Sequence, residues 1–201
     1  MYKIGITGSI GTGKTTTARL FGLFNIPIFD ADNEIKNLLN SEKIKEKLKN
    51  KWPKIVSGDI IDKKKLKSII FSNKNEKKHL EKLLYPYLEI EKRKFEKLNH
   101  TSNILVYDVP LIYETNSEKN YDLILLTNCD TNLQRKRVLK RDKISNLLFE
   151  KIIKSQLSFK EKVKFKPKVI NTNNIKLFIL FKIIALLIRI QIKLKITNEK
   201  T

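Results

Sequence analysis

Cysteine, histidine and tryptophan are scarce in this chain, and their scarcity removes whole classes of function. Cys129 is the only cysteine among 201 residues, so no intrachain disulfide can form and a reducing compartment is predicted. His79, His100 and Trp52 stand alone, without the spacing of a metal-binding motif. We therefore interpret all four residues as packing or surface positions rather than metal ligands.

The sequence also lacks the features of secreted and membrane-spanning proteins. Its first ten residues, MYKIGITGSI, contain no basic segment followed by an apolar one, so we expect no signal peptide and a cytoplasmic location. In the apolar tail after residue 174, the longest run without a charge is the six residues 183–188. A run of that length predicts no ordinary membrane span.

Acidic residues are few relative to basic ones. The chain has 42 Lys and Arg against 21 Asp and Glu, a formal net charge of +21. Such a charge suits either a nucleic acid or small polyphosphorylated molecules. Because the lysines are spread along the chain and no RNA-binding aromatic motif interleaves them, we favour solvated lysines with small anionic substrates, and expect no nucleic-acid partner.

Short apolar runs alternate with longer helical patterns. Strands are predicted at 4–7, 26–29, 103–107, 121–127 and 168–170, and helices at 15–24, within 34–99 and at 131–156. The long helical region is interrupted near Trp52-Pro53 and Ser57-Gly58. This alternation predicts an α/β fold with a parallel five-stranded sheet covered on both faces. Ligands of such sheets bind at the carboxyl ends of the strands.

The stretch GSIGTGKT contains the full motif G-x-x-x-x-G-K-[ST], formed by Gly8, Gly13, Lys14 and Thr15. It follows the first predicted strand and precedes the first predicted helix, which is the context of a phosphate-binding loop. Its backbone N–H groups would surround a phosphate. Lys14 would reach the β- and γ-phosphates, and the Thr15 hydroxyl would hold Mg²⁺. The motif predicts a nucleoside triphosphate site, and no guanine-reading N-K-x-D motif accompanies it.

Three aspartates follow predicted strands. Asp30 and Asp32 come after the second strand, and Asp108 ends the third. Asp32 is a candidate base for a hydroxyl acceptor, whereas either Asp30 or Asp32 could simply cap the next helix. Asp108 is a candidate Mg²⁺ ligand, and the alternative is a turn role before Pro110.

Arg137 and Arg141 are four residues apart, which places them on one face of a predicted helix. A cationic face closing over a triphosphate would stabilise the transferring phosphoryl group and exclude water. The alternative is a solvated basic face, which is the interpretation we give to Lys136 and Lys140.

Taken together, these stretches resemble the dephospho-CoA kinase family of P-loop nucleotide kinases. The resemblance is carried by IGITGSIGTGKTTTARLF, IPIFDAD, YDVPLIYE, QRKRVLKRD, the downstream Gln156 and VINTN, in that order across about residues 2–173. It implies transfer of the ATP γ-phosphoryl group to the ribose 3′-hydroxyl of dephospho-CoA. It also implies a three-layer P-loop core, an inserted helical region that receives the acceptor and a helical lid.

The resemblance implies a role for individual residues. The ATP phosphates would be held by Gly11, Thr12, Gly13, Lys14, Thr15 and Thr16, with Asn173 near the adenine. Asp32 would be the base, with Lys14, Arg137 and Arg141 assisting catalysis. The acceptor side would include Asp32, Asp108, Pro110, Leu111 and Glu114, and the metal side Thr15 and Asp108. The implied domain plan is a core of 1–33, 101–130 and 167–174, an acceptor region of about 34–100, and a lid of about 131–166.

Three positions depart from the family pattern. Tyr85 precedes Pro86 where many members have His, Lys63 follows Asp62 where Arg is usual, and Asn171 replaces a common Asp. Tyr85 removes a potential donor near the acceptor, and Lys63 keeps the charge but lacks the bidentate geometry of Arg. Each departure is expected to affect acceptor affinity more than reaction type.

The tail, residues 175–201, is far more apolar than the amphipathic closing helix expected of this family. It could be an apolar helix docked on the core, an interfacial membrane-binding segment, or a tail altered by a reading-frame change. Residues 188–196 alternate strictly and would also suit a strand.

Two rival functions remain open from the sequence. The first is another small-molecule P-loop kinase, acting on a nucleoside monophosphate. The second is a basic P-loop protein that binds nucleic acid with a steep salt dependence. The oligomeric state is not specified by the sequence.

Overall fold

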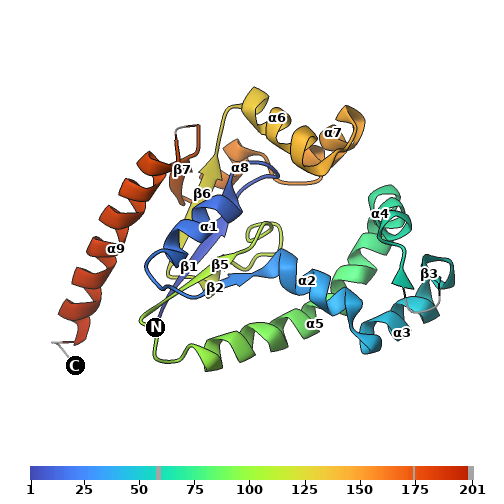
Figure 1. Ribbon diagram of the computed structural model, residues 1–201, viewed down its shortest axis with the longest axis horizontal. Coiled ribbons are helices and arrows are strands. Elements are labelled where there is room, and N and C mark those ends of the chain that lie inside the picture. Colours follow the sequence, from blue (N-terminus) through green and yellow to red (C-terminus); the bar gives the residue numbers. More distant parts are fainter. Residues whose placement is uncertain (58–59, 174, 199–201) are drawn as a thin grey trace. The chain divides into compact units, whose positions relative to one another are not determined.

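The computed structural model describes residues 1–57, 60–173 and 175–198 (Figure 1). The chain divides into two compact units, Met1–Ile28 with Ser102–Thr201, and Phe29–Thr101. Each unit has its own hydrophobic core. The first unit contains the phosphate loop, and the second corresponds to most of the predicted acceptor region.

A five-stranded parallel sheet is confirmed. Its strands are β1 (Tyr2–Thr7), β2 (Ile28–Asp30), β5 (Ile104–Asp108), β6 (Leu123–Asn128) and β7 (Lys168–Asn171), in the order β2-β5-β1-β6-β7. Central β1 pairs in parallel with β5 and β6, and β6 pairs with β7. The loop after β1 therefore leaves the middle of the sheet at its carboxyl edge, as the predicted α/β fold requires.

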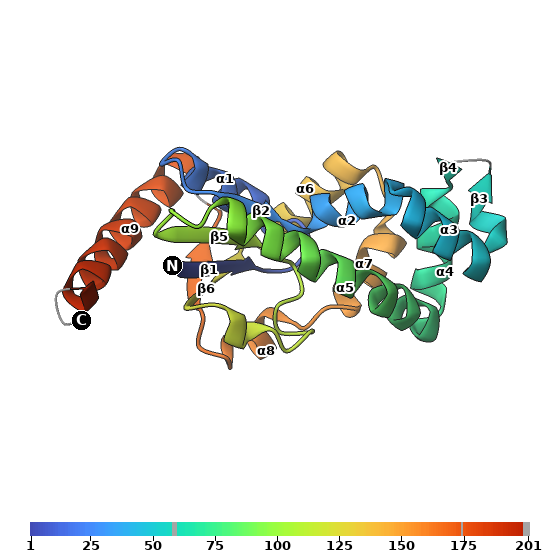
Figure 2. The ribbon, with the colours of Figure 1, turned by 90° about the horizontal axis from the view of Figure 1, so that it is seen from below.

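Helices cover this sheet in the first unit (Figure 2). The first unit contains α1 (Lys14–Gly22), α6 (Thr131–Asp142), α7 (Asn146–Lys154), α8 (Phe159–Val163), α9 (Lys176–Asn198) and the short η2 (Glu118–Asn120). Buried side chains such as Ile4, Phe21 and Val106 join β1, α1 and β5 in one core.

The helix predicted over 131–156 is interrupted. Lys143 adopts a left-handed conformation with φ 49°, which ends α6. The Ser145 side chain then accepts a hydrogen bond from the Leu148 N–H and starts α7. Because neither residue is Gly or Pro, hydrophobic periodicity gave no sign of this break.

The second unit contains α2 (Ala31–Asn40), α3 (Glu42–Lys51), η1 (Pro53–Ile55), β3 (Val56–Ser57), β4 (Ile60–Ile61), α4 (Lys63–Ser72) and α5 (Lys74–Leu98). Its core is built from residues such as Ile44, Leu48 and Leu84. The prediction of a helical region was wrong at β3 and β4, which form a small antiparallel pair. Strands of two residues are too short to show a period. Gly58 lies outside the described residues.

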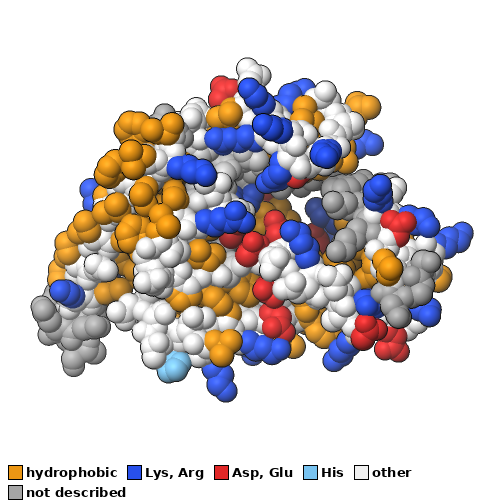
Figure 3. All heavy atoms as spheres, viewed as in Figure 1, with side chains coloured by type: hydrophobic (Ala, Val, Ile, Leu, Met, Phe, Trp, Pro, Cys, Tyr) orange, Lys and Arg blue, Asp and Glu red, His pale blue; other side chains and the backbone are white. Residues whose placement is uncertain are grey.

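The apolar tail forms helix α9. Ile179, Ile183, Leu186, Leu187 and Ile190 recur at helical spacing and are buried against the sheet core. Residues 188–196 are therefore helical, and the alternating pattern did not indicate a strand. The opposite side of α9 remains exposed (Figure 3). None of the helices in the described part of the chain has the length and apolar character needed to cross a bilayer.

The two sides of α9 differ in burial, so we expect them to contribute unequally to the free energy of unfolding. Ile183 is fully buried and Phe181 is 58% exposed, so Ile183→Ala should lower the free energy of unfolding by about 2–5 kcal/mol. Phe181→Ala, the matched control two residues away, should lower it by less than about 1 kcal/mol. Urea denaturation of both variants measures the difference. Equal losses would show that α9 does not pack on the core through this face.

Candidate phosphate-transfer site

Glycine is required in the phosphate loop by both conformation and space. Gly11 and Gly13 have φ values of 77° and 91°, in the left-handed region that side chains disfavour. A Cβ on Gly11 would lie 2.4 Å from Val138 Cγ2 of α6. The loop backbone therefore approaches α6 more closely than any other residue would permit.

The loop residues Lys14 and Thr12 are held by the loop itself. Lys14 Nζ lies 3.4 Å from the Ser9 carbonyl oxygen. The Thr12 hydroxyl donates to the same carbonyl at 2.7 Å and lies 2.9 Å from Thr127 Oγ1 of β6. The Thr12 hydroxyl is thus engaged within the protein, and the Thr12 N–H donates to the Ser9 carbonyl at 3.3 Å. Thr16, half-buried, lies in the first turn of α1.

The two predicted magnesium ligands converge. The Thr15 hydroxyl donates to Asp108 Oδ2 at 2.7 Å, and Asp108 is 4% exposed. Hydroxyl and carboxylate oxygens are hard ligands that suit Mg²⁺. Among the described residues no group of three or more His, Cys, Asp and Glu could hold a metal ion. A Mg²⁺ at this pair would therefore take its remaining ligands from phosphates and water, as is usual for this ion.

In the second unit, Asp30 and Asp32 have different environments. Asp30 is the N-cap of α2, and its side chain accepts the Asn33 N–H at 2.9 Å. Asp32 lies in the first helical turn and is exposed. The capping role that the sequence left open for either residue therefore belongs to Asp30, and the Asp32 carboxylate is not used as the cap.

The two arginines point to different partners. Arg137 donates to Thr172 Oγ1 at 3.1 Å and to the Thr172 carbonyl at 2.9 Å. Thr172 in turn donates to the Thr12 carbonyl of the loop at 2.8 Å. Arg141 is instead engaged by the neighbouring Asp142 carboxylate. Arg137 is thus linked to the phosphate loop through Thr172.

Asn173 connects the end of β7 to α6. Its Oδ1 accepts the Asp130 N–H at 2.7 Å, and its own N–H donates to Asn171 Oδ1 at 2.8 Å. Asn171, which replaces a common Asp, therefore still supplies an acceptor oxygen. The segment predicted to lie near adenine is fixed at the N-terminus of α6.

Two glutamines hold the tip of the loop. Gln134 Nε2 donates to the Ile10 carbonyl at 2.6 Å, and Gln156 Oε1 accepts the Ile10 N–H at 3.1 Å. Gln134 and Gln156 both belong to the stretches that carry the family resemblance, which implies no contact of either with the loop. The sequence carried no signal for these contacts, because they join residues more than 120 positions apart.

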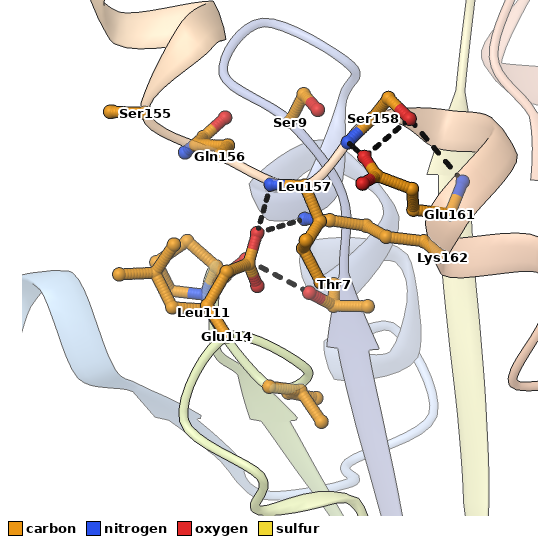
Figure 4. Close-up of polar contacts among 12 residues, drawn as sticks. Thr7, Ser9, Leu111, Glu114, Ser155, Gln156, Leu157, Ser158, Glu161 and Lys162 are labelled. Carbon is orange, nitrogen blue, oxygen red and sulfur yellow. Dashed lines mark hydrogen bonds and ion pairs between the residues drawn. The ribbon is translucent and has the colours of Figure 1, made fainter.

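The predicted acceptor stretch is anchored through Glu114 (Figure 4). Glu114 Oε1 accepts the Leu157 N–H at 3.0 Å and lies 2.8 Å from Nζ of the fully buried Lys162. Earlier in the stretch, the Pro110 carbonyl accepts the Thr7 hydroxyl at 2.9 Å, and Leu111 is half-buried. Glu114 therefore ties this stretch to α8, and its contact with an acceptor stays a prediction.

Two remaining side chains are neutral at physiological pH. Burial raises the pKa of the Cys129 thiol above its usual value, so this residue does not offer a thiolate. In the second unit, burial and the Glu81 carboxylate raise the pKa of Tyr85 to about 12. Tyr85 thus keeps a neutral hydroxyl that can donate a hydrogen bond, at the position where the family resemblance led us to expect His. The Lys63 side chain lies outside the described part of the structure.

The glutamine contacts predict an effect on ATP affinity. Gln156→Leu leaves the Ile10 N–H without its acceptor, a loss of about 1–3 kcal/mol when the group stays desolvated. We expect ATP to bind about tenfold more weakly, as measured by isothermal titration calorimetry. Ser155→Ala, which removes a neighbouring side chain bonded only to the Ile152 carbonyl, should bind ATP like the parent. Unchanged affinity in Gln156→Leu would refute a role for this contact in shaping the loop.

Two relatives are similar to this chain over most of its length. A dephospho-CoA kinase of Fusobacterium nucleatum is 35% identical over 186 residues, covering 89% of this chain and 93% of the relative. A dephospho-CoA kinase of Bradyrhizobium diazoefficiens is 32% identical over 176 residues, with 87% and 88% coverage. Both matches extend far beyond the phosphate loop.

Solved structures agree on the fold. TT1252 from Thermus thermophilus superposes with a TM-score of 0.82 at 26% identity, covering 94% of this chain and 96% of that one. A dephospho-CoA kinase from Campylobacter jejuni gives 0.66 at 23% identity, with the same coverage. A shikimate kinase from Acinetobacter baumannii gives 0.51 at 17%, covering 94% of each chain. The last two show the fold alone.

The family model described as dephospho-CoA kinase matches residues 2–177. This range contains the phosphate loop, the Thr15–Asp108 pair and both glutamines. The chain belongs to the dephospho-CoA kinase family.

Proposed function

We propose that this chain transfers the γ-phosphoryl group of ATP to the ribose 3′-hydroxyl of dephospho-CoA, giving CoA and ADP. The observation that carries the proposal is the family match over residues 2–177, which includes a loop whose geometry suits a triphosphate. The fold shared with the solved kinase structures adds support at the level of architecture only.

The loop supplies the binding and most of the charge. Backbone N–H groups from Gly11 to Thr16 and the Lys14 ammonium would hold the ATP phosphates at the N-terminus of α1, where the helix dipole favours anions. Arg137 lies beside the loop through Thr172, which supports a role in stabilising charge on the transferring group. We assign Arg141 the same role, which requires it to exchange Asp142 for phosphate. Asn173 would lie near adenine.

Thr15 and Asp108 would hold Mg²⁺ together with the ATP phosphates. Their oxygens are 2.7 Å apart and have the chemistry that this ion prefers. When bound, Mg²⁺ supplies positive charge to the β- and γ-phosphates. The protein's part is to present the two oxygens on rigid elements, at the start of α1 and the end of β5.

We assign the base to Asp32. As the 3′-oxygen forms its bond to Pγ, the bond from Pγ to the β-phosphate oxygen breaks and ADP leaves. The 3′-hydroxyl proton passes to the Asp32 carboxylate. Support comes from the local structure, because Asp30 serves as the cap and Asp32 is exposed. No covalent enzyme intermediate is needed, so the rate depends on positioning and charge.

The remaining roles complete the proposal. The stretch from Asp108 through Pro110 and Leu111 to Glu114 would line the acceptor side, residues of about 34–100 would receive the acceptor, and about 131–166 would form the lid. The single free cysteine, which leaves no intrachain disulfide to be formed, supports a cytoplasmic location.

ADP release from MgATP tests the acceptor and the base together. Dephospho-CoA should stimulate release, whereas AMP, 4′-phosphopantetheine and the absence of an acceptor should not. Asp32→Asn should lower kcat by about 10²–10⁴-fold with little change in KM, because the carboxylate acts on the proton in the transition state.

Asp30→Asn is the matched control, since Asn caps a helix as well as Asp does, and its kcat should stay within about threefold of the parent. Stimulation by AMP instead of dephospho-CoA would identify a nucleoside monophosphate kinase. Retention of full activity by Asp32→Asn would remove this residue as the base.

A further inference from the structure

Helix α9 has a second apolar face that the fold does not use. Phe178, Phe181, Ile188 and Ile192 are each more than half exposed. They follow one another at spacings of three, seven and four, with Ala185 between, and therefore form one row along the helix. Hydrophobic side chains gather on the side of the molecule that α9 forms, at the left of Figure 3. An exposed apolar row of this length marks an interaction surface.

Basic side chains border this row. Lys182, Arg189 and Lys193 each come directly after a residue of the row, so they lie along one edge of it. Lys176 and Lys195 are exposed near its two ends. Residues 175–198 contain no Asp or Glu. The surface thus combines apolar contact area with charge of a single sign.

A cavity of about 320 Å³ opens beside the row. It lies between α9 and the segments 24–27 and 102–104, and its lining includes Phe24, Ile184, Leu187 and Ile188. Ile188 belongs to both the row and the cavity wall. Phe24, 39% exposed, extends the apolar surface beyond α9. The surface therefore combines the exposed apolar row with a cavity beside it.

The charge distribution identifies the occupant. A second copy placed against this face would bring two rows of cations together with no carboxylate between them, which is repulsive. An anionic lipid surface meets both requirements, since its headgroups pair with Lys and Arg while its acyl region accepts Phe and Ile. We propose that the exposed face of α9 docks the protein on an anionic lipid bilayer.

Docking would occur in the plane of the membrane. The opposite face of α9 is committed to the protein core through Ile179, Ile183 and Ile190, so lipid can reach only one side. The 23 residues of α9 extend for about 35 Å, enough for the whole row to contact one leaflet. The cavity beside Ile188 has room for part of an acyl chain. Docking through this face of α9 does not depend on the proposed kinase activity.

Vesicle co-sedimentation of the full chain tests the proposal. Vesicles of phosphatidylcholine mixed equally with phosphatidylglycerol should sediment the protein, and vesicles of phosphatidylcholine alone should do so at least about tenfold less well. Lys182→Gln combined with Arg189→Gln should weaken binding to the anionic vesicles about 25-fold, at about fivefold for each charge. Lys49→Gln with Lys97→Gln, the same loss of charge at exposed positions of the second unit, should bind like the parent.

A second pair separates the apolar contribution from charge. Phe181→Gln with Ile192→Gln should weaken binding at least about tenfold, whereas Ile90→Gln with Leu98→Gln, also exposed, should not. Circular dichroism melting checks that each variant is folded. If the Lys182 and Arg189 variant loses no more binding than its charge control, only net charge matters and the proposal is overturned. If the Phe181 and Ile192 variant loses no more binding than its apolar control, the exposed face of α9 does not contact lipid and the proposal is overturned. Absence of anionic-vesicle binding by the parent, or a dimer that dissociates in Phe181→Gln, would overturn it as well.

Discussion

The hydrogen bonds that fix the phosphate loop are the constraint on which this structure depends. The loop follows β1 directly, and its tip and its turn are held by side chains from distant elements. Gln134 and Gln156 bind both backbone groups of Ile10, while Thr172 binds the Thr12 carbonyl. These bonds order the loop before ATP arrives, so less conformational entropy is lost on binding.

The close contact between this loop and α6 joins the loop to the predicted lid. Gly11 has no room for a side chain beside Val138. A movement of α6 toward the loop would therefore push the loop backbone with it. Gln134 belongs to α6 and Gln156 follows α7. Both side chains form hydrogen bonds with the backbone of Ile10. Displacement of the predicted lid segment would therefore alter the loop's backbone. Glu114 extends the link to the predicted acceptor stretch through Lys162. A change in the position of the predicted acceptor stretch would therefore also affect the phosphate loop.

Much of this arrangement could be predicted from the sequence, because its signals are local. Buried parallel strands are continuous apolar runs, and the loop motif fixes glycines, Lys14 and Thr15 at set positions. The order of strand and helix then placed Asp108 at the same sheet edge as Thr15, and the 2.7 Å contact confirms that they meet. The five-stranded parallel sheet follows from the same reasoning.

The rest could not be predicted, because it depends on contacts between distant parts of the chain. The Gln156 contact with Ile10 spans 146 positions, and nothing near Gln156 indicates it. The break at Lys143 uses a left-handed residue that is not Gly, and the β3–β4 pair is too short for a pattern. The tail was ambiguous because apolar residues cover both faces of α9, one in the core and one exposed, so neither a helical nor an alternating period was clean.

Direct observation of the product tests the central claim, that the loop delivers a phosphoryl group to a ribose 3′-hydroxyl. Dephospho-CoA, ATP and Mg²⁺ incubated with the protein can be followed by ³¹P NMR. We expect a new phosphomonoester signal coupled to the ribose 3′ proton, growing in step with ADP. Growth of inorganic phosphate alone, or a phosphomonoester at another position, would contradict it.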